Sequence, residues 1–146
     1  TGKGVFEVIQ EANRAEGITK EEIASGSKVP KYFAVATDID HDGMFPGEVL
    51  VTGLKKMPET IYSAIEDITK NNFRNGLHLV DFKDGDTGIS EMKYTKKYIP
   101  EEALVLVKKA EKLMTNRDKR LQIPLDIMDV SEYVKNFIVP EELLIK

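Results

Sequence analysis

Cysteine is absent from this chain of 146 residues, which excludes disulfide bonds, thiolate catalysis and cysteine metal sites. No apolar run approaches the roughly 18 residues that a membrane-spanning helix needs, and no charged-then-apolar signal sequence opens the chain. Neither sign of charge dominates, because 21 Lys and Arg stand against 25 Asp and Glu and give a net charge of -4. The composition therefore provides no overall basic field that would favour nucleic acid or an anionic membrane as a partner.

Several sequence signatures of enzymes are missing as well. Gly2-Lys3-Gly4 opens a helical pattern, where exposed N–H groups attract anions or hydroxyl oxygens. It lacks the third glycine of a dinucleotide fingerprint and the Lys-Ser/Thr ending of a P-loop. No serine lies in a nucleophile elbow, and His41 and His78 are too isolated for a triad or a metal site. We therefore expect no enzyme and no cofactor, and keep Gly2 and Gly4 as candidate ligand contacts.

Helical and strand patterns alternate along the chain, whose length suits one domain or one lobe of a larger protein. Helices are expected over 5–16, 20–25 and 100–114, and over a segment that begins at 58 and ends between 71 and 75. Strands are expected over 32–38, 49–54 and 76–82. This order predicts a layered α/β fold with a mainly parallel sheet flanked by helices. Residues 1–120 would form a ligand-binding lobe with crossover segments, and 121–146 a C-terminal tail with a short helix over 131–137. Buried positions are expected at Phe6 and along the stripe Ile61, Ala64, Ile65 and Ile68.

The clearest candidate site is the stretch 32–43, where an apolar, β-branched run breaks into Asp38, Asp40 and Asp42. In open α/β sheets, ligands bind outside the carboxyl ends of the strands. Asp38 is the first charged side chain at this end, and its carboxylate can bind the vicinal hydroxyls of a sugar or cap its own loop. Asp40 and Asp42 are expected to be solvated loop acids, with Asp42-Gly43 forming a turn.

The spacing of the three aspartates also matches part of a calcium loop. Asp38, Asp40, Asp42 and Gly43 occupy its positions 1, 3, 5 and 6. Position 12, which should supply a bidentate glutamate, is Val49, so the loop would hold the ion weakly at best. Calcium binding is therefore the less favoured interpretation.

Lys55 ends the second predicted strand. If the two strands are parallel, Lys55 and Asp38 emerge at the same edge of the sheet. The ammonium group can then donate hydrogen bonds to ligand oxygens or pair with Asp38. The alternative is an ordinary surface lysine.

Five segments carry a family resemblance: 1–6 (TGKGVF), 34–40 (AVATDID), 49–56 (VLVTGLKK), 64–67 (AIED) and 82–89 (FKDGDTGI). Their order and spacing, over roughly residues 1–115, resemble the C-terminal part of the basic membrane protein family. These are purine nucleoside receptor-like substrate-binding lipoproteins of ABC importers. The chain departs from the family pattern at Ala36-Thr37, where the family usually has Gly-Val, and at His41, where it has glutamine.

The resemblance implies one lobe of a type I periplasmic-binding-protein-like fold. It also implies that Asp38 and Lys55 hold the ribose of a nucleoside, with Gly2 and Gly4 close to the ligand and Asp40 as a supporting group. The implied partners are a nucleoside, an ABC permease and an N-terminal lobe of the same protein, outside the cytoplasm and anchored by lipid. On this basis we expect the chain to be a fragment. A ligand-sensing regulatory domain of the same fold, or an α/β enzyme using Asp38 and Asp40 as acid and base, are the alternatives.

Overall fold

The computed structural model describes residues 3–121 and 127–144. The chain divides into two compact units. Unit 1 comprises Thr1–Leu79 and Gly85–Tyr98, and unit 2 comprises Val80–Asp84 and Ile99–Lys146. Within the described residues, no helix is both long enough and apolar enough to cross a membrane.

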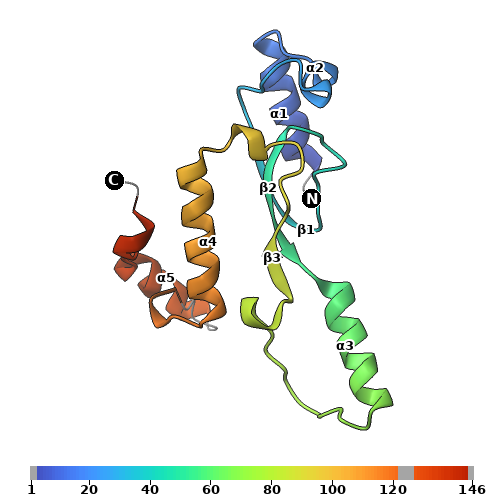
Figure 1. Cartoon of the computed structure of the whole chain (residues 1–146), viewed down its shortest axis with the longest axis vertical. Coiled ribbons are helices and arrows are strands. Elements are labelled where there is room, and N and C mark those ends of the chain that lie inside the picture. The colour runs from blue at the N-terminus through green and yellow to red at the C-terminus, as the bar shows by residue number, and fades with distance from the viewer. Residues whose placement is uncertain (1–2, 122–126, 145–146) are drawn as a thin grey trace. The chain divides into compact units, whose positions relative to one another are not determined.

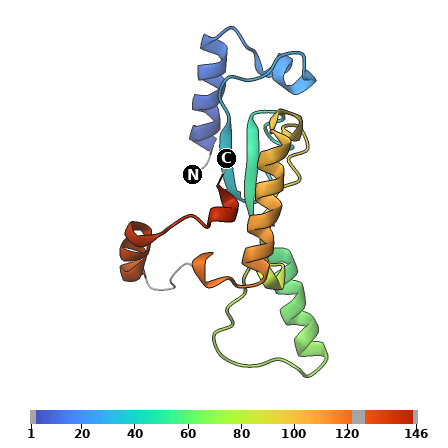
Figure 2. The ribbon, with the colours of Figure 1, turned by 60° about the vertical axis from the view of Figure 1, so that its left-hand side comes forward.

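Unit 1 contains a small mixed sheet flanked by helices, which confirms the α/β fold class. The strands lie in the order β1-β2-β3, with β1 parallel to β2 and β2 antiparallel to β3 (Figure 1). The antiparallel β3 makes the sheet mixed rather than mainly parallel. Helix α1 lies alongside β1 (Figure 2). In chain order the elements are α1 (Lys3–Ala15), α2 (Lys20–Ser25), β1 (Ala34–Asp38), β2 (Val49–Lys55), α3 (Met57–Thr69), β3 (Thr87–Ile89) and the 3-10 turn η2 (Lys96–Tyr98).

Local sequence signals place the two N-terminal helices as expected. Gly17, with φ of 74°, follows the end of α1. Thr19 accepts a hydrogen bond from the backbone N–H of Glu22, whose carboxylate accepts one from the backbone N–H of Thr19, so a capping box begins α2 where the sequence predicts a helix. Gly26 ends α2 in the left-handed conformation, where a side chain would cost energy. These ends depend on contacts within a few residues, which explains their agreement with the sequence pattern.

The third strand lies elsewhere than the sequence pattern predicts. Residues 76–82 were expected to form it, but they contain no strand. Leu77 is 88% exposed, so its apolar side chain has no packing partner in unit 1. Instead β3 forms further along the chain, at Thr87–Ile89, because it can pair with the end of β2. Apolar alternation indicates a strand only where another strand is available to pair with it.

The core of unit 1 lies where α1 meets the parallel strands. Phe6, Ala34, Ala36 and Val49 are buried together, and the Phe6 ring stacks on the ring of Phe45 with centroids 4.2 Å apart. The prediction that Phe6 is a core residue is confirmed. Burying such side chains provides most of the stabilisation of a small unit, at about 25 cal/mol for each Å² of apolar surface.

The apolar stripe of α3 was predicted to be buried, and the structure shows it exposed. Ile61 and Ile65 are each 54% exposed and Ile68 is 56% exposed. The helical period of the stripe is as predicted, but no element of unit 1 covers it. Helical period shows which residues share a face, whereas burial depends on what lies against that face.

Arginine–carboxylate pairs follow the long helix of unit 2. Arg117 donates to Asp81 at 2.7 Å, and Arg120 donates to Asp118 at 2.8 Å. The hydrogen bond from Arg120 lowers the pKa of Asp118 from its ordinary value of 3.8 to about 2. The ionised pair therefore favours the folded state above pH 3.8, and its contribution is lost as the pH falls through about 2. The elements of this unit are η1 (Phe82–Asp84), α4 (Glu101–Thr115), η3 (Lys119–Leu121), α5 (Ile127–Asn136) and η4 (Glu141–Leu143).

Candidate functional site

The ends of β1 and β2 bring Asp38 and Lys55 together. Because the two strands are parallel and Asp38 pairs with Leu54 in the register, Lys55 lies one residue beyond it at the same edge. The Nζ atom of Lys55 is 2.8 Å from Oδ1 of Asp38. Of the two arrangements open to Lys55, the structure contains the ion pair with Asp38. The pair lies where ligands bind in open α/β sheets.

The Asp38–Lys55 pair is exposed and carries backbone strain. The two side chains are 58% and 64% exposed, so a ligand can reach both. Asp38 has φ of 81°, a left-handed conformation that costs a non-glycine residue of order 1–3 kcal/mol. Such strain is concentrated at functional sites, where it aims a side chain. The hydrogen bond to Asp38 raises the pKa of Lys55 above its usual value, so the ammonium form persists at neutral and moderately alkaline pH.

The pair has unused hydrogen-bonding capacity. An ionised carboxylate can accept about four hydrogen bonds, and an ammonium group can donate three. The ion pair uses one of each. Adjacent hydroxyl groups on a ligand can therefore donate to Asp38 and accept from Lys55 at the same time. Charge-assisted hydrogen bonds of this kind are about twice as strong as neutral ones.

The other predicted ligand contacts are Gly2, Gly4 and Asp40. Gly2 lies outside the described residues. Gly4 is in the first turn of α1, and no heavy atom lies within 4 Å of where a Cβ would be, which leaves space beside its backbone. Asp40 is exposed, and its Oδ1 accepts a hydrogen bond from the backbone N–H of Asp42 at 2.9 Å. The structure thus joins Asp38 to Lys55 and turns Asp40 back toward its own loop.

Asp42 and Gly43 form the predicted turn, but the expectation that Asp42 is solvated is wrong. It is 5% exposed, with Oδ1 accepting from the Ser90 hydroxyl at 3.4 Å and Oδ2 accepting from the backbone N–H of Lys93 at 3.0 Å. The Ser90 hydroxyl oxygen in turn accepts from the backbone N–H of Thr52. Asp42 therefore ties the loop after β1 to the segment after β3. Its partners lie about 50 residues along the chain, so no local pattern could show them.

A second contact that the sequence did not indicate lies directly after Lys55. The backbone N–H of Lys56 donates to the carbonyl of Asp86 at 2.7 Å, and the Thr60 hydroxyl donates to the carboxylate of Asp86. Asp86 precedes β3 and bonds to the first turn of α3. These bonds fix the backbone from which the Lys55 side chain extends.

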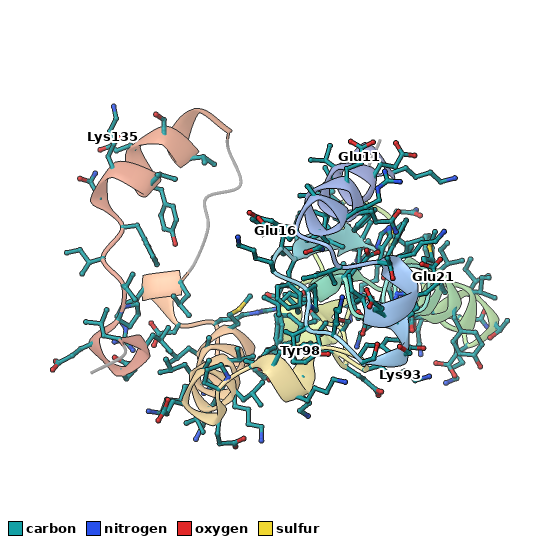
Figure 3. All side chains as sticks on the ribbon, turned by 90° about the horizontal axis from the view of Figure 1, so that it is seen from above. Glu11, Glu16, Glu21, Lys93, Tyr98 and Lys135 are labelled. Atoms are coloured by element: carbon teal, nitrogen blue, oxygen red, sulfur yellow. The ribbon has the colours of Figure 1, made fainter. Side chains whose placement is uncertain are left out.

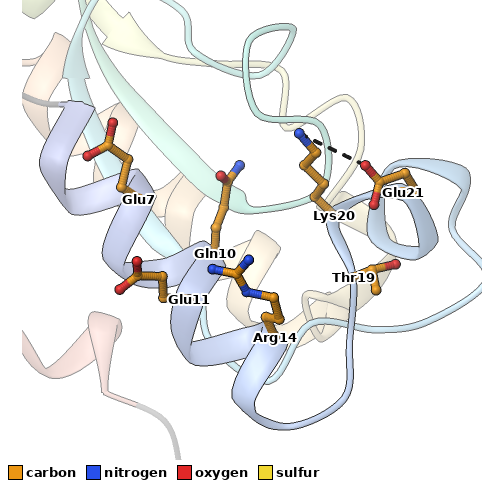
Figure 4. A pocket seen from close by; sticks show the side chains of 7 residues that line it. All are labelled: Glu7, Gln10, Glu11, Arg14, Thr19, Lys20 and Glu21. Atoms are coloured by element: carbon orange, nitrogen blue, oxygen red, sulfur yellow. Dashed lines mark ion pairs between the residues drawn. The ribbon is translucent and has the colours of Figure 1, made fainter.

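Two hollows in the surface lie apart from the predicted residues. One, of about 380 Å³, lies between α1 and α2, and its polar lining includes Lys20 and Glu21, whose charged atoms are 3.9 Å apart (Figure 4). The other, of about 810 Å³, lies between α4 and η4 in unit 2. Neither is lined by Asp38, Asp40 or Lys55. Among the described residues, no group of three or more His, Asp or Glu side chains could hold a metal ion.

Comparison with known proteins bears on the fold of the chain. No model of a protein family matches the chain, and no curated protein matches its sequence. A solved structure of an ABC transporter system solute-binding protein from Aeropyrum pernix K1 matches with a TM-score of 0.59 and 17% sequence identity. The match covers 80% of this chain and 39% of that protein.

The chain has the fold of part of a solute-binding protein. At 17% identity this likeness concerns the fold and does not extend to the ligand. The chain spans well under half the length of that neighbour. The match supports a solute-binding-protein fold, and the type I topology implied by the sequence resemblance stays a prediction.

Proposed function

We propose that this chain is part of the substrate-binding component of an ABC importer and that Asp38 and Lys55 bind the ribose of a nucleoside. The observation that carries the proposal is the exposed ion pair at the carboxyl ends of two parallel strands. Support comes from the fold shared with a solute-binding protein and from the resemblance to the basic membrane protein family. In that setting the protein works outside the cytoplasm, anchored by lipid, and delivers its ligand to a permease.

The geometry of the pair suits two neighbouring hydroxyl groups. The ribose 2′- and 3′-hydroxyls lie on adjacent carbons, so one can donate to Asp38 while the other accepts from Lys55. The backbone near Gly2 and Gly4 and the carboxylate of Asp40 are proposed as supporting contacts. Binding requires no covalent step. Asp40 is engaged with a backbone N–H, which argues against an acid–base pair with Asp38.

The exposed apolar surface of unit 1 supports a second lobe as partner. Val35 on β1 is 70% exposed, Ile39 beside Asp38 is 62% exposed, and the α3 stripe is open along its length. Apolar surface of this extent is typical of a face that another protein element covers. We propose that a second lobe of the same protein covers part of it and closes over the ligand, supplying the contacts to the base.

The proposal is tested by calorimetric titration of the intact protein with nucleosides, free bases and free sugars, for the wild type and Asp38→Ala. Hydrogen bonds to a charged group contribute about 1.5–3 kcal/mol, so Asp38→Ala should weaken nucleoside binding by about 10- to 100-fold. Asp67→Ala, which removes the same charge from the exposed surface of α3, serves as the control and should bind like the wild type. Unchanged nucleoside affinity in Asp38→Ala would rule out the ribose assignment.

A further inference from the structure

A short segment after β3 is held firmly against the sheet of unit 1. Met92 and Thr95 are buried, and the Thr95 hydroxyl donates to the carbonyl of Leu50 on β2 at 2.7 Å. The backbone N–H of Lys93 donates to buried Asp42. Buried hydrogen bonds of this kind are costly to break. The outward side chains of residues 93–98 therefore extend from a fixed backbone.

Three exposed lysines and two half-buried tyrosines of this segment make up a basic, aromatic surface, here called the lysine–tyrosine surface: Lys93, Tyr94, Lys96, Lys97 and Tyr98. The three lysines are exposed, and none of them has a carboxylate within 4.0 Å among the described residues. The Nζ atoms of Lys93 and Lys97 lie 5.5 and 4.9 Å from the ring centroids of the tyrosines that follow them. Figure 3 labels Lys93 and Tyr98, the first and last residues of this set.

The surface continues onto the end of α2. The Lys97 ammonium group lies so close to Gly26 that a Cβ there would come within 2.9 Å of it. Lys28, two residues further along, pairs with Glu22 at 2.9 Å. The Glu22 carboxylate is thus paired with Lys28 and not with Lys93, Lys96 or Lys97. These three lysines can therefore attract an external anion.

We propose that the lysine–tyrosine surface binds an anionic phospholipid membrane. All its cations are lysines, whereas bidentate recognition of a specific phosphate or carboxylate favours arginine. Lysine and tyrosine together suit the headgroup region, where the ammonium groups attract anionic lipids and the rings lie at the interface. The lysines over Tyr94 and Tyr98 also occupy ring faces on which nucleic-acid bases would have to stack. The net charge of -4 conceals this local cluster. The proposal does not depend on the nucleoside assignment.

The test is co-sedimentation of the protein with vesicles of phosphatidylcholine alone and of phosphatidylcholine with phosphatidylglycerol in equal parts. Each lysine near an anionic surface contributes about a fivefold gain in binding, so replacing Lys93, Lys96 and Lys97 with serine should weaken partitioning by roughly 100-fold. The control replaces Lys108, Lys109 and Lys112 with serine, which removes the same charge from exposed positions of α4. This control variant should lose much less binding to the mixed vesicles than the variant of the lysine–tyrosine surface.

Binding to the mixed vesicles should fall steeply in about 1 M salt, where the Debye length is about 3 Å. Three results would overturn the proposal. They are equal binding to both kinds of vesicle, equal losses in the two triple variants, and lysine-dependent binding of a single-stranded oligonucleotide without binding to the vesicles. The last result would identify this surface as a nucleic-acid site.

Discussion

Replacing Asn13 with alanine should lower the free energy of unfolding by about 3 kcal/mol, because it removes a buried side chain that satisfies three backbone groups. Asn13 is fully buried on α1. Its Oδ1 accepts from the backbone N–H groups of Lys31 and Tyr32 at 2.9 and 3.0 Å, and its Nδ2 donates to the carbonyl of Tyr32 at 3.0 Å. One side chain thus satisfies three backbone groups. It also fixes the segment that leads into β1 and its terminal Asp38.

Urea unfolding followed by far-ultraviolet circular dichroism measures this loss. Arg14→Ala, at the next position on α1, changes an exposed side chain and should alter the free energy of unfolding by about 0.5 kcal/mol or less. A loss below about 1 kcal/mol for Asn13→Ala would show that water or a shifted backbone replaces the three bonds. The connection between α1 and β1 would then have to rest on the apolar core alone.

Replacing Asp42 with alanine should lower the free energy of unfolding by about 2–4 kcal/mol. The substitution removes a buried acceptor from the Ser90 hydroxyl and from the backbone N–H of Lys93. It also leaves a cavity, and cavity formation adds to the loss. The loss of contacts should be largest between the loop after β1 and the segment after β3, because Asp42 joins these two segments.

Hydrogen exchange at the Lys93 amide reports this contact directly. That amide should exchange at least about 10-fold faster in Asp42→Ala than in the wild type, since its acceptor is gone. Glu91→Ala removes the same charge from an exposed neighbouring position and should leave the exchange rate unchanged. Equal exchange in Asp42→Ala and the wild type would contradict the buried role of Asp42.

The features predicted correctly from the sequence depend on short-range physics. The helix expected over 20–25 is bounded by the capping box at Thr19 and the left-handed Gly26, which depend on contacts within three or four residues. The burial of Phe6 follows from its place on the apolar face of α1. The meeting of Asp38 and Lys55 required one further assumption, that the two strands are parallel, and the structure satisfies it.

The features that the sequence could not provide depend on distant partners. The local sequence around Asp42 predicts a solvated acid. Its partners in the structure are Ser90 and Lys93, about 50 residues away along the chain. Asn13 occupies a polar position on an amphipathic helix, and its burial depends on backbone groups 18 and 19 residues further on. The three aspartates of the 38–42 loop look equivalent in sequence. In the structure one pairs with a lysine, one bonds within the loop and one is buried.

The most direct test of the central claim is a two-dimensional ¹⁵N–¹H correlation spectrum of the chain during titration with a purine nucleoside. This measurement detects the weak binding expected of one wall of a cleft. If Asp38 and Lys55 bind the ribose, the largest amide shifts lie at Asp38, Ile39 and Lys55 and are lost in Asp38→Ala. Shifts confined to the hollow between α4 and η4, with Asp38 and Lys55 unchanged, would contradict it.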